Sequence, residues 1–183
     1  AAKKGHKEIV KLLLAKEDVN VNQVDKNGNT PLHTAVTLGR KEIFKMLLAK
    51  ENINVNQVDK NGLTALHFAV TKGYIEIVEK LLNKEEILVN EEDKYKETPL
   101  HTAATIGRKK IIEKLLADER IEINKENNDG ETPLLVAAKK GHKEIVKLLL
   151  AKEDINVNQV DKYGNTPLHT AVTIGRKGII EKL

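Results

Sequence analysis

Apolar residues between positions 30 and 58 follow a helical period in two short runs. Thr30 is a good N-cap and Pro31 suits the first turn of a helix, and the apolar residues that follow share one helix face (Leu32, Ala35 and Val36). After Gly39 a second amphipathic run begins near Lys41, with apolar residues on one face and Lys and Glu on the other. The pattern predicts two short helices separated by a tight break.

This pattern returns with a fixed period of 34 residues. The threonines that open the first helix mark the period: Thr30, Thr64, Thr98, Thr132 and Thr166. Between one helix pair and the next, segments such as residues 51–62 are rich in Asn, Asp and Gly and have no helical period. Such a composition predicts an extended loop that ends in a tight turn.

One asparagine recurs in the same phase of this loop, and we interpret it as a side chain that bonds the backbone of a neighbouring loop. Its positions are Asn22, Asn56, Asn90, Asn124 and Asn158. A single helix pair would leave apolar surface on both sides, so copies must stack to be stable. The sequence therefore predicts a solenoid in which each repeat buries the face of its neighbour.

The recurring motif TPLHTAV, followed by GRKEI, LL, VN and DKNG, resembles the ankyrin repeat, and the resemblance covers the whole chain. It implies an all-α solenoid of stacked helix-turn-helix units, with turns projecting from one edge to form a concave binding face. We expect one array over residues 1–183, divided into units 1–24, 25–58, 59–92, 93–126, 127–160 and 161–183, the first and last being partial.

The exit from the second helix departs from the family, in which a repeat usually has 33 residues and leaves this helix through a glycine. Here the exit reads AKEDVNVN or AKENINVN. We expect Asp18, Asn52 and Asp154 to adopt the left-handed cap that glycine normally supplies, with Val19, Ile53 and Ile155 making the apolar contact behind it.

Composition narrows the class of protein. The 183 residues are 40% hydrophobic, 32% charged and 3% aromatic, with no Cys and no Ser. A net charge of +4 is spread over interleaved Lys and Glu, which is typical of a solvated surface and does not favour nucleic-acid binding. The sequence has no stretch long enough to predict membrane insertion, and we expect a cytoplasmic protein.

Recurrent histidines at positions 33, 67, 101 and 169 raise the question of a metal or catalytic site. They recur once per repeat, and stacked helices lie about 8–10 Å apart, too far for two imidazoles to share a zinc ion. We interpret them as ties between adjacent turns, with one tie missing because Leu135 occupies the slot in the fifth unit. No nucleotide-binding or zinc-protease motif is present, and residues 18–29 lack the Gly and Glu of a calcium loop. We expect no enzyme activity, no metal and no cofactor.

Positions that differ between repeats at projecting sites are the candidate partner contacts. Tyr95 and Tyr163 are the strongest anchors, because Tyr offers a large contact area with little loss of entropy. Lys96 replaces the expected turn glycine, for which the sequence offers no explanation. The predicted partner-binding residues are Asn27, Leu38, Asn61, Leu63, Lys72, Tyr95, Lys96, Ile106, Asp129, Lys140, Tyr163 and Ile174.

Two functions are compatible with this pattern. The first is a monomeric, non-catalytic scaffold that binds a partner protein along its concave face. The second is a structural spacer, whose ends stack between molecules. Residues 1–47 match residues 137–183 at 40 of 47 positions, and neither end carries a polar capping unit, so the sequence is either part of a longer array or able to stack end to end.

Overall fold

The computed structural model describes residues 6–175 and 178. These residues form ten α-helices and no strand, which confirms the predicted all-α repeat fold. Contacts within the chain group it into two compact units, residues 1–88 and 89–183. The single array of residues 1–183 stays a prediction.

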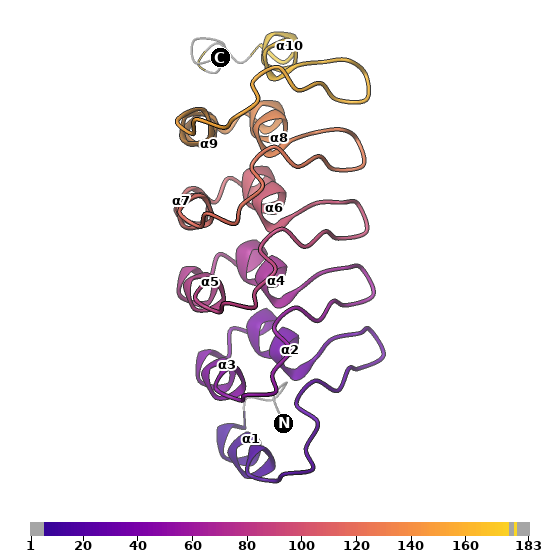
Figure 1. Ribbon diagram of the computed structural model, residues 1–183, viewed down its shortest axis with the longest axis vertical. Coiled ribbons are helices and arrows are strands. Elements are labelled where there is room, and N and C mark those ends of the chain that lie inside the picture. Colours follow the sequence, from indigo (N-terminus) through magenta and orange to yellow (C-terminus); the bar gives the residue numbers. More distant parts are fainter. Residues whose placement is uncertain (1–5, 176–177, 179–183) are drawn as a thin grey trace. The chain divides into compact units, whose positions relative to one another are not determined.

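Each repeat consists of a first helix, which follows the turn tip, and a second helix. The first unit contains two first helices, α2 (Pro31–Thr37) and α4 (Ala65–Lys72), and three second helices, α1 (Lys7–Leu14), α3 (Lys41–Leu48) and α5 (Ile75–Leu82). Helices α2 and α4 stack on one another, and α1, α3 and α5 follow one another in a second column (Figure 1).

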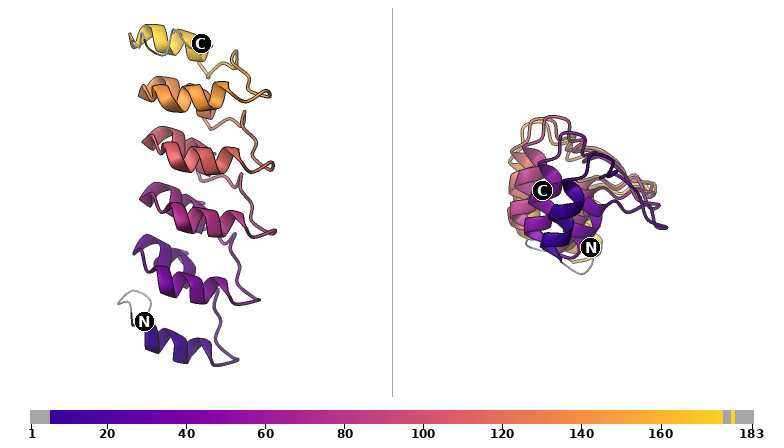
Figure 2. Two further views of the ribbon diagram at one scale, coloured as in Figure 1. Left: turned by 90° about the vertical axis from the view of Figure 1, so that its left-hand side faces the viewer. Right: turned by 90° about the horizontal axis from the view of Figure 1, so that it is seen from below.

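The second unit repeats this arrangement. Its elements are α6 (Pro99–Ile106), α7 (Lys109–Leu116), α8 (Pro133–Lys140), α9 (Lys143–Leu150) and α10 (Pro167–Thr173). The first helices α6, α8 and α10 stack in order, and α7 packs on α9. Within each unit the second helices lie one above another with nearly parallel axes (Figure 2).

A threonine caps each first helix as the sequence predicts. The hydroxyl of Thr98 accepts a hydrogen bond from the backbone N–H of His101, and the imidazole of His101 accepts one from the backbone N–H of Thr98. This reciprocal pair satisfies two donors that a helix start leaves open. Thr132 keeps only the first of these bonds, because Leu135 has no side-chain acceptor.

Burial follows the predicted apolar faces. In the first helices Leu32, Ala35 and Val36 and their equivalents are almost completely buried where a further repeat lies on each side. Closely packed small and branched side chains fill most of the core, in which Phe44 is a buried aromatic ring. His142, at the start of α9, is half-buried and donates from Nε2 to the carbonyl of Thr105 at 3.1 Å. Its ring lies against Gly107, where a Cβ atom would come within 2.8 Å of the imidazole.

The recurrent asparagines join neighbouring loops as predicted. Asn124 donates from Nδ2 to the carbonyl of Asp154 at 2.6 Å and accepts from the N–H of Asn156 at 2.8 Å. Asn22, Asn56 and Asn90 make the same pair of bonds to the loop that follows in their own unit. Each side chain thus holds the next loop at two points.

The exit from the second helices differs from the prediction. Among the described residues Lys96 is the only non-glycine with a positive φ, so Asp18, Asn52 and Asp154 do not adopt a left-handed cap. The helices instead end right-handed, at residues such as Ala49 and Ala151, and continue into i to i+3 turns. The asparagine of the preceding repeat fixes the next loop and removes the need for a local cap. Of the three apolar residues expected behind this exit, Ile53 is buried, whereas Val19 and Ile155 are only half-buried.

Replacing Asn124 by Ala should lower the free energy of unfolding by about 1–2 kcal/mol, because two hydrogen bonds of ordinary strength are lost. Urea denaturation would measure the change. Asn158→Ala is the matched control, since the side chain of Asn158 makes no hydrogen bond to a described residue. Equal destabilisation by the two substitutions would contradict the two-point role of Asn124.

Candidate functional site

Each projecting turn is closed by the side chain of its first residue. Asp161 accepts through one carboxylate oxygen from the N–H groups of Tyr163 and Asn165, at 2.9 and 2.8 Å. The first residues of the other turns (Asp25, Asp59, Asp93 and Asn127) accept the same two bonds. Because local hydrogen bonds fix the backbone, every tip has the same conformation.

Neighbouring tips are also joined to each other within a unit. Lys60 donates its N–H to the carbonyl of Asn27 at 3.0 Å, and Lys162 donates to that of Asp129 at 2.8 Å. Within each unit the tips and the adjoining first helices therefore form a fixed edge (Figure 1).

The predicted partner-binding residues lie along this edge in both units. Leu63 is half-buried, and the other eleven are exposed. The first unit carries Asn27, Leu38, Asn61, Leu63 and Lys72, and the second carries Tyr95, Lys96, Ile106, Asp129, Lys140, Tyr163 and Ile174. Their role in binding stays a prediction.

Two exposed tyrosines lie on the turn tips of the second unit. Tyr95 is 57% exposed and Tyr163 is 76% exposed. A lysine lies over each ring, Lys94 at 5.0 Å and Lys162 at 5.1 Å from the ring centroid. These distances suit a cation–π interaction that orients an exposed ring.

The lysine beside Tyr163 also contacts the preceding tip. Lys162 forms an ion pair with Asp129 of the preceding tip at 2.6 Å, which lowers the pKa of Asp129. Sequence reasoning singled out Asp129 but missed Lys162. The signal available was a lysine 33 residues after the acidic tip residue Asp129, but nothing local in the sequence links the two.

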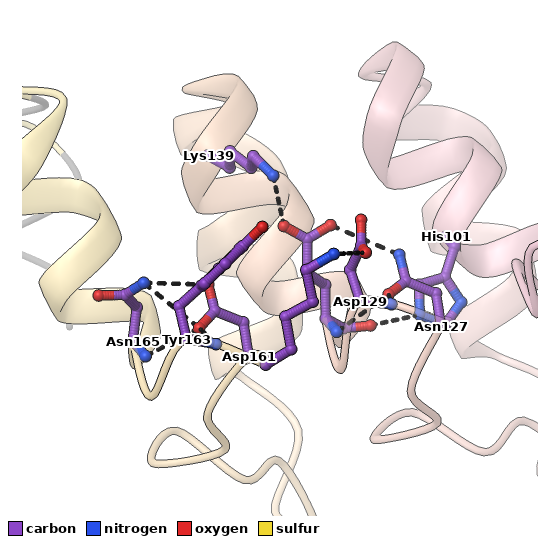
Figure 3. A network of polar contacts seen from close by, with 9 residues as sticks. His101, Asn127, Asp129, Lys139, Asp161, Tyr163 and Asn165 are labelled. Carbon is purple, nitrogen blue, oxygen red and sulfur yellow. Dashed lines mark hydrogen bonds and ion pairs between the residues drawn. The ribbon is translucent and has the colours of Figure 1, made fainter.

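A second row of polar groups lies between the tips and the helices of the second unit (Figure 3). Glu131 is buried and accepts a bond from Lys139 of α8 at 2.5 Å. Desolvation, with the charges of Asp93 and Glu131, raises the pKa of Glu97, while Lys140 and Asn127 oppose that rise. The row carries charges of both signs, and the lysines of α8 offset the two glutamates.

His101 of α6 is hydrogen-bonded to this row through Glu131. Its Nδ1 accepts from the N–H of Thr98, so the proton resides on Nε2, which donates to the carbonyl of Glu131 at 3.0 Å. The predicted tie between adjacent turns is confirmed here. Desolvation by burial lowers the pKa of His101, which keeps the ring neutral.

His33 makes the same cap in the first unit but lacks a second bond. Its buried Nε2 has no hydrogen-bond partner, although the carbonyls of Gln57 and Leu63 face it with poorer geometry. The ring of Phe68 packs edge-on against it, with centroids 5.6 Å apart. Phe68 is half-buried in this contact.

No group of three His, Cys, Asp or Glu side chains among the described residues could hold a metal ion. None of the ten described helices has the length and apolar character that a membrane span requires.

The fold and the edge define a tandem helical-repeat protein with a fixed, projecting surface. A family model for ankyrin repeats matches residues 1–59, 51–127 and 107–183. The chain therefore belongs to the ankyrin repeat family, whose repeats are in general protein–protein interaction modules and typically lack catalytic activity.

A solved structure is similar over nearly the whole chain. The crystal structure of EF0377, an ankyrin repeat protein, matches with a TM-score of 0.92 and 28% sequence identity, covering 99% of this chain and 92% of the other. No curated protein matches the sequence.

The second unit should lose stability in mild acid. The lowered pKa of His101 means that, below its ordinary value of 6.5, the unfolded chain binds a proton that the folded chain does not. The free energy of unfolding should therefore fall as the pH drops through this value, and it should fall less steeply in His101→Leu. Thermal denaturation at a series of pH values measures this change in the free energy of unfolding. The series runs from about pH 7.5 to about pH 5.5, roughly one unit on either side of the ordinary histidine pKa. His6→Gln is the control, because His6 is exposed. An unchanged slope in His101→Leu would contradict the assignment.

Proposed function

We propose that the chain is a non-catalytic scaffold that holds a partner protein along the turn tips and first helices. The observation that carries the proposal is the exposure of Tyr95 and Tyr163 on turns that hydrogen bonds fix in place. Exposed tyrosines contribute little to the fold, but they are among the side chains that contribute most at protein interfaces.

The fixed backbone of the tips supports the proposal energetically. Each turn is closed by a side-chain acceptor and bonded to a neighbouring tip, as at Asp161 and Lys162. A surface that is already ordered loses little conformational entropy when a partner binds. The edge is therefore preorganised, and its side chains decide which partner fits.

Variation among the tips supports a selective surface. The residue at the tip is Asn27, Asn61, Tyr95, Asp129 or Tyr163, while the closing Asp or Asn and the threonine cap are kept. Ile106 and Ile174 add exposed apolar groups at the ends of α6 and α10. The second unit thus combines aromatic, apolar and charged groups, whereas the tips of the first unit carry amides.

The combined substitution Tyr95→Ala with Tyr163→Ala should weaken binding of the physiological partner more than tenfold, since each anchor contributes on the order of 1–2 kcal/mol. Affinity capture with mass spectrometry identifies the partner, and calorimetry on the purified pair measures the change. Leu88→Ala is the control, because Leu88 is exposed on a loop of the first unit. Unchanged affinity in the tyrosine variant would contradict the proposed face.

One observation favours a structural spacer that self-associates as the second candidate. Helix α1 exposes Ile9 and Leu13, and α10 exposes Leu168 and Val172. Apolar side chains at such positions pack against a neighbouring repeat elsewhere in the chain, and a second molecule could supply that neighbour.

The two candidates differ in how molecular mass depends on concentration. The scaffold predicts a constant monomer mass in sedimentation equilibrium across about a hundredfold range of concentration, because a closed binding surface needs no second copy. Open-ended association predicts a mass that grows with concentration. Leu168→Glu with Val172→Glu should abolish any such growth, while Tyr163→Ala, on the tip of the same repeat, should leave it unchanged.

A further inference from the structure

Lys96 occupies a backbone conformation that lysine rarely adopts. Its φ is +58°, in the left-handed region, and every other described turn has a glycine at this position. Those glycines have a φ of +72° to +82°. A Cβ atom at Gly28 or Gly130 would lie 2.9 to 3.1 Å from backbone atoms of the next tip, so glycine is the better fit to this turn.

The turn itself does not require a lysine at this position. Asp93 accepts from the N–H groups of Tyr95 and Glu97 as its equivalents do, and Asn128 donates its N–H to the carbonyl of Tyr95 at 2.9 Å. The fold thus tolerates a strained residue where glycine would form the same bonds. Strain of this kind is concentrated at ligand-binding positions, where a side chain is needed for another reason.

The charges around this tip differ from those around the equivalent tip of the same unit. At Tyr163 the neighbouring lysine is bound to Asp129. At Tyr95 the exposed Lys96 has no ion pair with a described residue. The next tip carries the neutral Asn128 where the other described turns have a lysine. The carboxylate of Asp93 is occupied by two N–H groups. At this tip a positive charge without an ion pair to a described residue, that of Lys96, follows an exposed ring directly, whereas the uncharged Gly164 follows Tyr163.

We propose that the tip formed by Lys94, Tyr95 and Lys96 binds an acidic segment of the partner protein. Carboxylates of the segment accept hydrogen bonds from Lys96, while the ring of Tyr95 packs against its apolar atoms. The inference rests on the proposed function and adds the chemistry of the partner. The acidic residues Glu97 and Asp129 of the same unit confine the positive charge to this tip, so it suits a few carboxylates of a short segment better than the continuous phosphate backbone of a nucleic acid.

Fluorescence anisotropy with a fluorescein-labelled octaglutamate peptide tests the charge preference. We expect Lys96→Arg to bind as the wild type does. Lys96→Gly and Lys96→Asn, which suit the left-handed backbone but carry no charge, should bind about threefold to fivefold more weakly, as is typical of one exposed charge. Binding should weaken with salt, because exposed charges are screened beyond a Debye length of about 8 Å. An octalysine peptide should bind less well than octaglutamate. Equal affinity of all four proteins for octaglutamate would overturn the proposal.

The folding stability of the variants and the site at which octaglutamate binds are measured on the same proteins. Relief of the left-handed strain in Lys96→Gly should raise the folding equilibrium constant about fivefold or more, so weaker binding cannot be ascribed to unfolding. Octaglutamate should shift the amide resonances of Tyr95, Lys96 and Asn128 but not that of Tyr163. Shifts confined to the lysines of α7 and α9, or tighter binding of a labelled oligothymidine at Tyr95, would overturn the assignment to an acidic peptide.

The partner experiment separates this inference from the proposed function. If the partner is lost in the Tyr95→Ala and Tyr163→Ala variant but binds equally well to Lys96→Gly and Lys96→Arg, the face is correct and the acidic segment is wrong. If neither set of variants affects the partner, the proposed function itself fails.

Discussion

Burial of one repeat by the next is the interaction on which the rest of this structure depends. Helices α1 and α9 have the same sequence, KEIVKLLL, yet Ile9 and Leu13 of α1 are each 48% exposed, whereas Ile145 and Leu149 of α9 are 2% and 0% exposed. Both octapeptides are helical, so local propensity suffices for the element but not for the core. Neighbouring repeats supply the apolar contacts that stabilise helices only two turns long.

Short helices leave long loops, and the loops need partners for their polar backbone groups. The asparagine ladder and the closing Asp or Asn of each turn provide these partners, the first between repeats and the second within them. The same bonds that satisfy the backbone also fix the turn tips in space. A binding surface therefore arises from a requirement of folding, and the tip side chains remain available for recognition.

At Lys96 the needs of folding and of recognition differ, because glycine suits the backbone better whereas lysine supplies a charged side chain. The turn tolerates lysine in a left-handed conformation because its other hydrogen bonds hold the backbone in place. At Gly28 the same position lies against the backbone of Lys60, and no side chain could be accommodated without displacement. Specific side chains can thus be placed on the edge only where the repeat can absorb the cost in stability.

The sequence by itself determined the helices, their period and the asparagine ladder, because capping residues, apolar spacing and a strict repeat are local signals. It also predicted that His101 ties adjacent turns and that the tyrosines project. Only the tertiary structure decided the right-handed helix exits, the pairing of Asp129 with Lys162 and the packing of His142 on Gly107. Each of these depends on residues about one repeat apart in the chain, whose contact is set by how the helices stack rather than by the segment that contains either residue.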